Sequence, residues 1–445
     1  MKLIETLKNI WKIEDLRKRL TITFLFILIY RFGCHVVLPG INPADLEAMR
    51  NFTNSGLMQL LDMFSGGAFG QASIFALGIM PYITASIVIQ LMGMVVPSFQ
   101  KMQREGESGR MKLNQYTRYL TVAILLVQAP AYLLNLQYQV NAAGGHAHIA
   151  GWTMIYLSIV LTAGAMLIMW LGEKITDKGI GNGISLIILV GILARFPGAI
   201  VQEFTGRLNT AQGGLVMFLV EIVILFAVTA GAVMLTQGTR KVPVQYAKRI
   251  VGNKQYGGAR QYIPLKVNAA NVMPIIFAQA LMFIPITLAG FGARQNDSGF
   301  LGSLSRTFGD MNGFWYNVVY FLLIVAFTYF YTAITVRPTQ MAEEMKKNSG
   351  FIPGIKPGKK TAEYLDSIMS RITLPGSLFL GVVAILPAFA RLFGVNQNFA
   401  QFFGGTSLLI TVGVVLDTLQ QIETHLRMHH YDGLMKSGKI KGRAS

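Results

Sequence analysis

The stretch that decides the fold begins with a short apolar segment, GLMQLLDMFSGGA at residues 56–68. At about a dozen residues it is shorter than the roughly 20 that a helix needs to cross a bilayer. Ser65-Gly66-Gly67 separates it from IFALGIMPYITASIVIQLMGMVV, residues 74–96, which is long enough to cross. Short apolar segments at membrane depth are tolerated where protein surrounds them. We therefore expect either a movable, re-entrant pore plug or an ordinary helix on the external surface.

Composition places the whole chain in a membrane. Of 445 residues, 52% are hydrophobic and only 13% are charged, whereas soluble domains carry about 25% charged residues. Ten apolar stretches are long enough to span. They are Leu20–Val37, Ile74–Val96, Gln115–Leu136, Trp152–Leu171, Gly181–Ile200, Gly214–Leu235, Asn271–Gly290, Phe314–Val336, Ile372–Ala390 and Gly404–His425. The sequence therefore predicts an all-α, multi-pass membrane protein of ten transmembrane helices.

The distribution of Lys and Arg predicts the orientation. Of 39 such residues, 32 lie in or next to the two termini and the loops after the second, fourth, sixth and eighth spans. Loops rich in Lys and Arg remain cytoplasmic. Both termini are therefore predicted to be cytoplasmic, and the net charge of +18 is first of all a signal of topology.

Two of the basic loops are too long to be simple connections. Residues 237–270 contain seven basic residues and no acid, and two arms rich in β-formers flank a glycine-rich tip. This pattern predicts a protruding hairpin. Residues 337–371 are also basic and contain a Pro/Gly turn, IPGIKPG, at 352–358. Either the loops only set the topology, or they dock an acidic or RNA-rich partner.

Similar interruptions recur in the second and the seventh span, and in the fifth and the tenth. Gly78-Ile79-Met80-Pro81 corresponds to Asn271-Val272-Met273-Pro274, and the glycines at 181 and 183 correspond to Gly404-Gly405. Matching breaks in two halves indicate an internal repeat with a pathway between the halves. With five spans in each half, the repeat is inverted. The predicted halves are residues 1–205 and 206–445.

Few side chains within the spans could support chemistry. Glu221 in the sixth span could be a functional acid, or an acid that faces a neighbouring helix or lipid head groups. Ser108 lies in a GESG pattern known from rhomboid proteases, but no histidine at membrane depth could act as its base. We expect no catalytic residue, no metal site and no cofactor.

Isoleucines recur at helical spacing beside the interrupted segments. Ile79 and Ile83 are four residues apart, as are Ile184 and Ile188, so each pair shares one helix face. Ordinary helix packing and the narrow part of a pore are both compatible with this spacing.

Many separate stretches resemble the SecY family, in order and along essentially the full length. They include MFSGGA at 63–68, SIFALGIMPYI at 73–83, EGESGR at 105–110, QYTRY at 115–119, WLGE at 170–173, GIGNGIS at 179–185, YAKR at 246–249, PLKVN at 264–268 and GGTSLLI at 404–410. The resemblance implies a clamshell of two pseudo-symmetric inverted halves around a central pore. It implies a protein-conducting channel that also releases membrane segments laterally into lipid. The alternative from another class is a secondary transporter of small solutes.

The resemblance also implies roles for individual residues. A pore ring falls on Ile79, Ile83, Ile184, Ile188, Ile276 and Ile410, and a plug on about residues 56–71, with Leu57, Leu60, Leu61, Met63, Phe64, Ser65, Gly66 and Gly67. A lateral gate lies between the second and third spans and the seventh and eighth, with Gln128 and Asn271 as polar contacts. Docking falls on Arg240, Lys241, Lys248, Arg249 and Lys356. The family usually has arginine at 356, and lysine lacks its planar fork.

The partners implied by the resemblance are the small membrane subunits SecE and SecG, the ATP-driven motor SecA and the ribosome. SecD/SecF and YidC are further expected partners. Preproteins with signal sequences are the expected substrates, and the bacterial plasma (inner) membrane is the expected location.

Overall fold

We describe a computed structural model of the chain over residues 13–41, 62–142, 151–209, 214–246, 249–251, 254–256, 260–270, 272–279, 281–282 and 313–436. The chain forms two compact units, described separately below. Unit 1 comprises Met1–Val201 and Val414–Ser445, and unit 2 comprises Gln202–Gly413. The predicted division into inverted halves at residue 205 stays a prediction.

Long apolar helices dominate the described residues. Seven of them are long and apolar enough to cross a membrane: Glu107–Tyr138, Trp152–Lys178, Gly183–Leu208, Gly214–Gln237, Phe314–Lys347, Lys359–Leu392 and Gly405–Leu426. A pair over Met80–Gly93 and Pro97–Gln103, bent by 101°, would make an eighth. The fold is therefore that of a multi-pass helical membrane protein, and the count of ten stays a prediction.

The first and seventh predicted spans account for the difference. Helix α2 (Glu14–Cys34) begins six residues before the predicted span and takes in the charged residues Glu14 to Arg19. It also ends at Cys34, three residues before the predicted end, so only 15 residues of the predicted span are helical. In the seventh span, residues 273–279 and 281–282 are helical, and residues 283–290 lie outside the described part of the chain.

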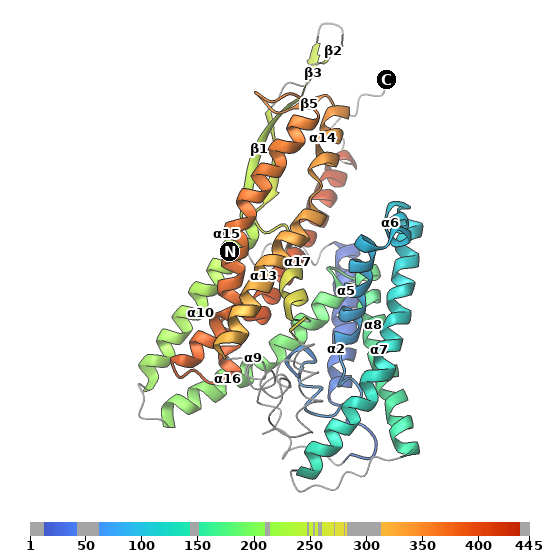
Figure 1. Cartoon of the computed structure of the whole chain (residues 1–445), viewed down its shortest axis with the longest axis vertical. Helices are drawn as coiled ribbons and strands as arrows, with labels where there is room; N and C mark the ends of the chain where they lie inside the picture. The colour runs from blue at the N-terminus through green and yellow to red at the C-terminus, as the bar shows by residue number, and fades with distance from the viewer. Residues whose placement is uncertain are drawn as a thin grey trace. The chain divides into compact units, whose positions relative to one another are not determined.

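Unit 1 packs its helices around a common apolar core. Helices α5 (Met80–Val95), α7 (Glu107–Ala142) and α8 (Trp152–Lys178) are neighbours, with the short α6 (Pro97–Arg104) at the end of α5 (Figure 1). The core includes Phe69, Ala76, Tyr132, Leu133 and Leu161. It therefore buries the chain before α5 between helices α7 and α8.

Two corresponding helices begin at the same local sequence. Helix α5 begins at Met80 with Pro81 in its first turn, and the helix over residues 273–279 has Pro274 in its first turn. Proline is tolerated there because the N–H it lacks would have no partner within the helix. The predicted breaks are therefore helix starts, and residues 74–79 form turns where a helix was predicted.

Helices α9 (Gly183–Asn209) and α17 (Gly405–Lys436) begin at glycine-rich turns, as the sequence predicted. The Asn182 side-chain oxygen accepts hydrogen bonds from the N–H groups of Ile184 at 3.1 Å and Ser185 at 3.4 Å. These bonds cap the start of α9. The division between the two units falls inside both helices.

Apart from the short helical stretch at residues 273–279, the described part of unit 2 contains five further helices and two small β-sheets. Helix α13 (Phe314–Thr335) packs against the long α15 (Lys359–Leu392), and α10 (Gly214–Gln237), α14 (Pro338–Lys347) and α16 (Gln397–Ala400) also contact α15. Glycine at 381 lets the Phe321 ring of α13 approach the α15 backbone. Figure 1 shows α13 and α15 lying side by side.

The predicted hairpin in residues 237–270 is confirmed. Strands β1 (Thr239–Tyr246) and β4 (Arg260–Lys266) pair antiparallel, from Thr239 opposite Lys266 to Gln245 opposite Arg260. Strands β2 (Arg249–Val251) and β3 (Lys254–Tyr256) pair at the tip. Strand β5 (Gly350–Phe351) adds to the other edge of β1, so the two long basic loops form one sheet in the order β4-β1-β5.

Candidate functional site

The predicted plug continues into a buried run of turns over residues 65–79, which we call the turn segment. Side chains of α2 hydrogen-bond to the first residues of the turn segment. The hydroxyl of Tyr30 donates to the Ser65 carbonyl at 3.2 Å, and Arg31 Nη1 donates to the Gly66 carbonyl at 3.0 Å. The Ser65 carbonyl also accepts the N–H of Ala68 at 3.4 Å, and the α2 side chains add donors to both carbonyls, so these backbone groups of a non-helical stretch are satisfied.

Asp62, just before the turn segment, is the second point of attachment. Its buried carboxylate forms an ion pair with Arg195 of α9 and accepts the N–H of Gly70 at 2.6 Å. From α7, the Tyr132 hydroxyl donates to the Phe69 carbonyl at 2.8 Å. Helices α2, α7 and α9 therefore all hold one short stretch of chain. An acid so deeply buried is tolerated because charged and N–H groups surround it.

Glycine permits the closest contact of the turn segment with α9. Gly66 has a φ of +69°, and a Cβ there would lie 2.9 Å from the Cα of Gly191. Gly67 has a φ of +91°, but a Cβ there would come no nearer than 3.8 Å to the Arg195 side chain. Gly66 is therefore needed for both conformation and space, and Gly67 for conformation only.

The sequence analysis missed the residues that hold this segment. Tyr30, Gly191 and Arg195 were not identified as functional. Arg195 lies inside the fifth predicted span, where an arginine is costly unless it is paired. That cost was the signal available, but it does not indicate which acid pairs with Arg195.

The six isoleucines of the predicted pore ring lie in both units. Ile79, at the N-cap of α5, and Ile188 of α9 are buried, whereas Ile83 and Ile184 are half-buried; all four belong to unit 1. Ile276 is half-buried and Ile410 is buried in unit 2. Their assembly into one ring stays a prediction.

Some predicted residues lie outside the described part of the chain. These are Leu57, Leu60 and Leu61 of the plug, Asn271 of the gate and Lys248 of the hairpin. Met63, Phe64 and Ser65 are described and buried. Gln128 lies half-buried on α7, which packs against α5. The lateral gate stays a prediction.

The basic sheet has one apolar, buried face and one exposed face. Val242 and Val244 of β1 pack with Leu265 of β4, and with Leu365 and Met369 of α15. Strand residues alternate between the two faces, so Lys241 lies on the face opposite Val242 and Val244, whereas Arg240 is in phase with these valines but exposed near the start of the strand. Arg249 lies in β2 at the tip, and Lys356 is exposed in the loop after β5. The apolar face therefore fixes the hairpin on α15.

These features define a class: an α-helical, multi-spanning membrane protein with a short non-helical segment buried among its spans and a basic sheet at one end of its second unit. A sequence model of the SecY family matches residues 73–419. The chain belongs to the SecY family.

Relatives and solved structures agree with this assignment. The chain is 43% identical over 437 residues to the protein translocase subunit SecY of Streptomyces galbus, covering 96% of this chain and 98% of the relative. It is 42% identical over 440 residues to the same subunit of Corynebacterium glutamicum, covering 96% and 98%. Two structures share the fold. One is a protein-conducting channel (TM-score 0.59, 19% identity, 92% of each chain). The other is a SecY protein whose plug domain is described as stabilising the closed translocation channel and maintaining a membrane seal (TM-score 0.61, 20% identity, 92% of each chain).

Proposed function

We propose that this translocase subunit is a channel through which unfolded preproteins cross the bacterial plasma membrane. The channel also releases membrane segments sideways into the lipid. The observation that carries the proposal is the turn segment, an apolar non-helical stretch that is buried within unit 1 and held by side chains of α2, α7 and α9. Non-helical backbone at membrane depth is tolerated where protein surrounds it. We therefore interpret the turn segment as the base of a plug and not as part of a spanning helix.

The isoleucine ring is the proposed seal. Narrow apolar constrictions exclude water and ions by dewetting. Branched apolar side chains offer a passing chain no fixed hydrogen-bond partner, so many different sequences can pass. In this proposal Ile79, Ile83, Ile184, Ile188, Ile276 and Ile410 close around the plug. The lateral gate would lie between the second and third spans and the seventh and eighth, with Gln128 and Asn271 as polar contacts.

The basic sheet is the proposed docking surface for the ribosome and for SecA, the source of ATP energy. Its exposed cations Arg240 and Lys241 lie near the start of β1, and Arg249 lies in β2 at the tip of the hairpin. Positive surfaces of this kind attract RNA and acidic proteins. A related channel, canine Sec61, is known in a complex with the ribosome. SecE and SecG are proposed as small membrane partners, SecD/SecF and YidC as further partners, and both termini are placed in the cytoplasm.

Transport of a preprotein into vesicles tests this function. The chain would be reconstituted with SecE and SecG and supplied with SecA, ATP and a preprotein with a signal sequence. We expect protease-protected preprotein to accumulate inside only when motor and ATP are both present. Vesicles that show no such protection, but exchange a small solute against an ion gradient, would favour the secondary transporter.

A further inference from the structure

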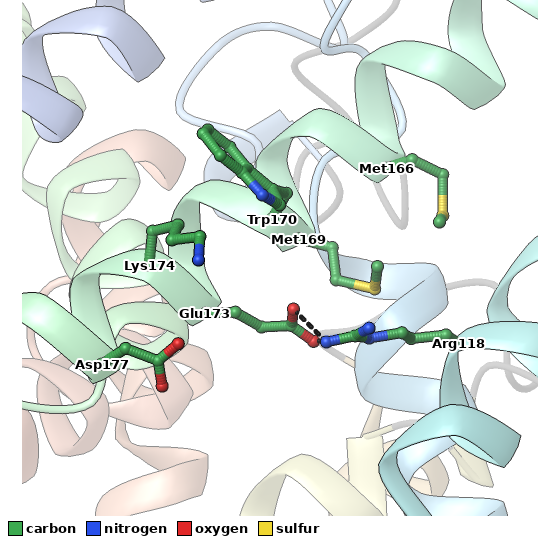
Figure 2. Close-up of a pocket in the computed structure, with 7 residues that line it drawn as sticks. All are labelled: Arg118, Met166, Met169, Trp170, Glu173, Lys174 and Asp177. Atoms are coloured by element: carbon green, nitrogen blue, oxygen red, sulfur yellow. Dashed lines mark hydrogen bonds and ion pairs between the residues drawn. The ribbon is translucent and has the colours of Figure 1, made fainter. Parts of the chain in front are cut away.

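A pocket of about 350 Å³ lies between α7 and α8 of unit 1. Arg118 of α7 lines one side, and six residues of α8 line the other (Figure 2). The α8 residues recur at spacings of three and four between 166 and 177, so they share one helix face. A pocket of this size matches known sites for small ligands.

The pocket changes from apolar to charged along α8. Met166, Met169 and Trp170 line the part toward the middle of the helix, and Glu173, Lys174 and Asp177 line the part toward its end. The apolar stretch of this span ends at residue 171. Tryptophan is enriched at the depth of lipid head groups. The charged end of the pocket therefore lies where head groups lie.

Positive and negative groups are balanced in this charged end. Arg118 and Glu173 form a two-bond ion pair, with Nε to Oε1 at 3.0 Å and Nη2 to Oε2 at 2.6 Å. This pair uses two of the five N–H donors of the guanidinium. Lys174 Nζ lies 6.0 Å from the centre of the Trp170 ring. Asp177 is exposed and makes no ion pair within the part of the chain that the structure describes.

We propose that this pocket binds the head group of a zwitterionic phospholipid that carries a primary ammonium. Its phosphate lies against the cations Arg118 and Lys174. Its ammonium donates hydrogen bonds to the carboxylates of Asp177 and Glu173. Lys174 and Asp177 are about 4.5 Å apart along the helix axis, so one short head group reaches both. The acyl chain at the glycerol end then packs on Trp170 and Met166.

Charge balance selects this ligand over the other common phospholipids. A purely anionic head group would meet two carboxylates beside the two cations, and like charges at this range repel. A choline head group keeps the positive charge but has no N–H to donate. Of these three head groups, only the ammonium lipid offers both a phosphate for the cations and N–H donors for the carboxylates that line the pocket.

Lipid retention by the purified complex tests the proposal. Native mass spectrometry would compare phosphatidylethanolamine, phosphatidylcholine and phosphatidylglycerol of identical acyl chains. We expect the ethanolamine lipid to be retained best. Asp177→Asn should weaken its retention by about fivefold, the upper range for one exposed ion pair. Glu107→Gln is the matched control, because Glu107 is an exposed carboxylate at the start of α7, outside the pocket.

A second measurement locates the lipid. A chain with Trp11, Trp152 and Trp315 replaced by Phe keeps Trp170 as its single tryptophan, which can be excited selectively at the red edge of the absorption band. Ethanolamine lipid with brominated acyl chains should quench Trp170 more strongly than the choline lipid, and Asp177→Asn should abolish the difference. Equal retention and quenching by the two lipids, preference for the glycerol lipid, or an Asp177→Asn variant that behaves like the Glu107→Gln control would each overturn the proposal.

Discussion

Arg207 near the end of α9 donates Nη2 to Glu221 Oε1 of α10 over 2.5 Å, and both side chains are buried in unit 2. Arg207 Nε also donates to Glu203 Oε1 at 2.9 Å, and Glu203 Oε2 accepts the N–H of Asn396 at 2.8 Å. Glu203, Arg207 and Glu221 are only 3%, 6% and 2% exposed. Glu221, which the sequence left as a functional acid or a residue facing a helix or lipid, is therefore one part of a buried three-residue cluster.

This cluster connects three elements of unit 2. It ties α9 to α10 and to the turn before α16, and Asn398 within α16 also donates to Gln202 of α9 at 2.7 Å. The rings of Phe204, Phe218 and Phe399 pack in a chain beside it. Because two carboxylates share one guanidinium, arginine is the residue on which the cluster depends.

We predict that Arg207→Gln destabilises the protein strongly. It leaves two carboxylates buried beside each other without a cation, and breaking a buried ion pair from one side costs about 3–5 kcal/mol. Thermal and denaturant unfolding of the purified complex would measure this. Arg118→Gln is the comparison, because that pair with Glu173 is half-exposed and exposed pairs contribute about 0.2–1 kcal/mol. Equal losses for the two variants would contradict the prediction.

We predict that replacing Glu221, in contrast, lowers the stability of the protein only slightly. Glu221→Gln removes one negative charge from the cluster and leaves the Glu203–Arg207 pair intact. Among the described residues Glu221 Oε2 has no hydrogen-bond partner, so the amide gives up little. The loss should stay within about 1 kcal/mol, the net worth of an ordinary hydrogen bond. The same unfolding measurement tests this prediction. A loss of stability as large as that of Arg207→Gln would contradict it and show that Glu221 is essential to the buried cluster.

The turn segment offers a matched pair of glycine variants. Gly66→Ala and Gly67→Ala both place a side chain at positive φ, at a cost of about 1–2 kcal/mol. Only Gly66→Ala also forces its Cβ against Gly191, which adds about 1–3 kcal/mol of overpacking. We expect Gly66→Ala to loosen the plug and raise the resting ion conductance in planar bilayers well above that of Gly67→Ala. Identical conductance in the two variants would remove this contact from the seal.

The pore ring is tested by polar replacement. Ile276→Asn or Ile410→Asn should wet the constriction, because an amide side chain supports water where isoleucine excludes it. We expect higher resting ion conductance and more export of proteins with defective signal sequences. Leu419→Asn is a control on the same helix as Ile410, at a half-exposed position. If the isoleucine variants show the same resting ion conductance as this control, these isoleucines are ordinary packing residues.

The basic hairpin is tested by charge reversal. Arg249→Glu at the tip should impair preprotein transport in vesicles, because it turns an attractive surface charge into a repulsive one. The variant should remain folded in the membrane, because the apolar contacts that fix the sheet lie on Val242, Val244 and Leu265. Arg391→Glu, at the other end of α15, supplies a control. Normal transport by the Arg249 variant would remove this residue from the docking surface.

The structure bears out the parts of the prediction that rest on local patterns. The antiparallel hairpin and the glycine-rich starts of α9 and α17 were expected from composition and spacing. The second span was wrong in detail, because helix was predicted from residue 74 and begins at Met80. Hydropathy measures how apolar a stretch is, and an apolar run of turns held by side chains of other helices scores like a helix.

The sequence by itself determined the membrane class, the predicted orientation of the basic loops and the family, because apolar length, charge asymmetry and ordered motifs are properties of the linear chain. Only the tertiary structure decided which distant side chains meet. Asp62 and Arg195 are 133 positions apart, and Glu203 contacts the backbone of Asn396 from 193 positions away. Hydrophobic patterning assigns faces to helices but does not pair them. Pairing depends on which buried charges and backbone groups find partners when the helices pack, and the cost of leaving any of them alone selects one arrangement.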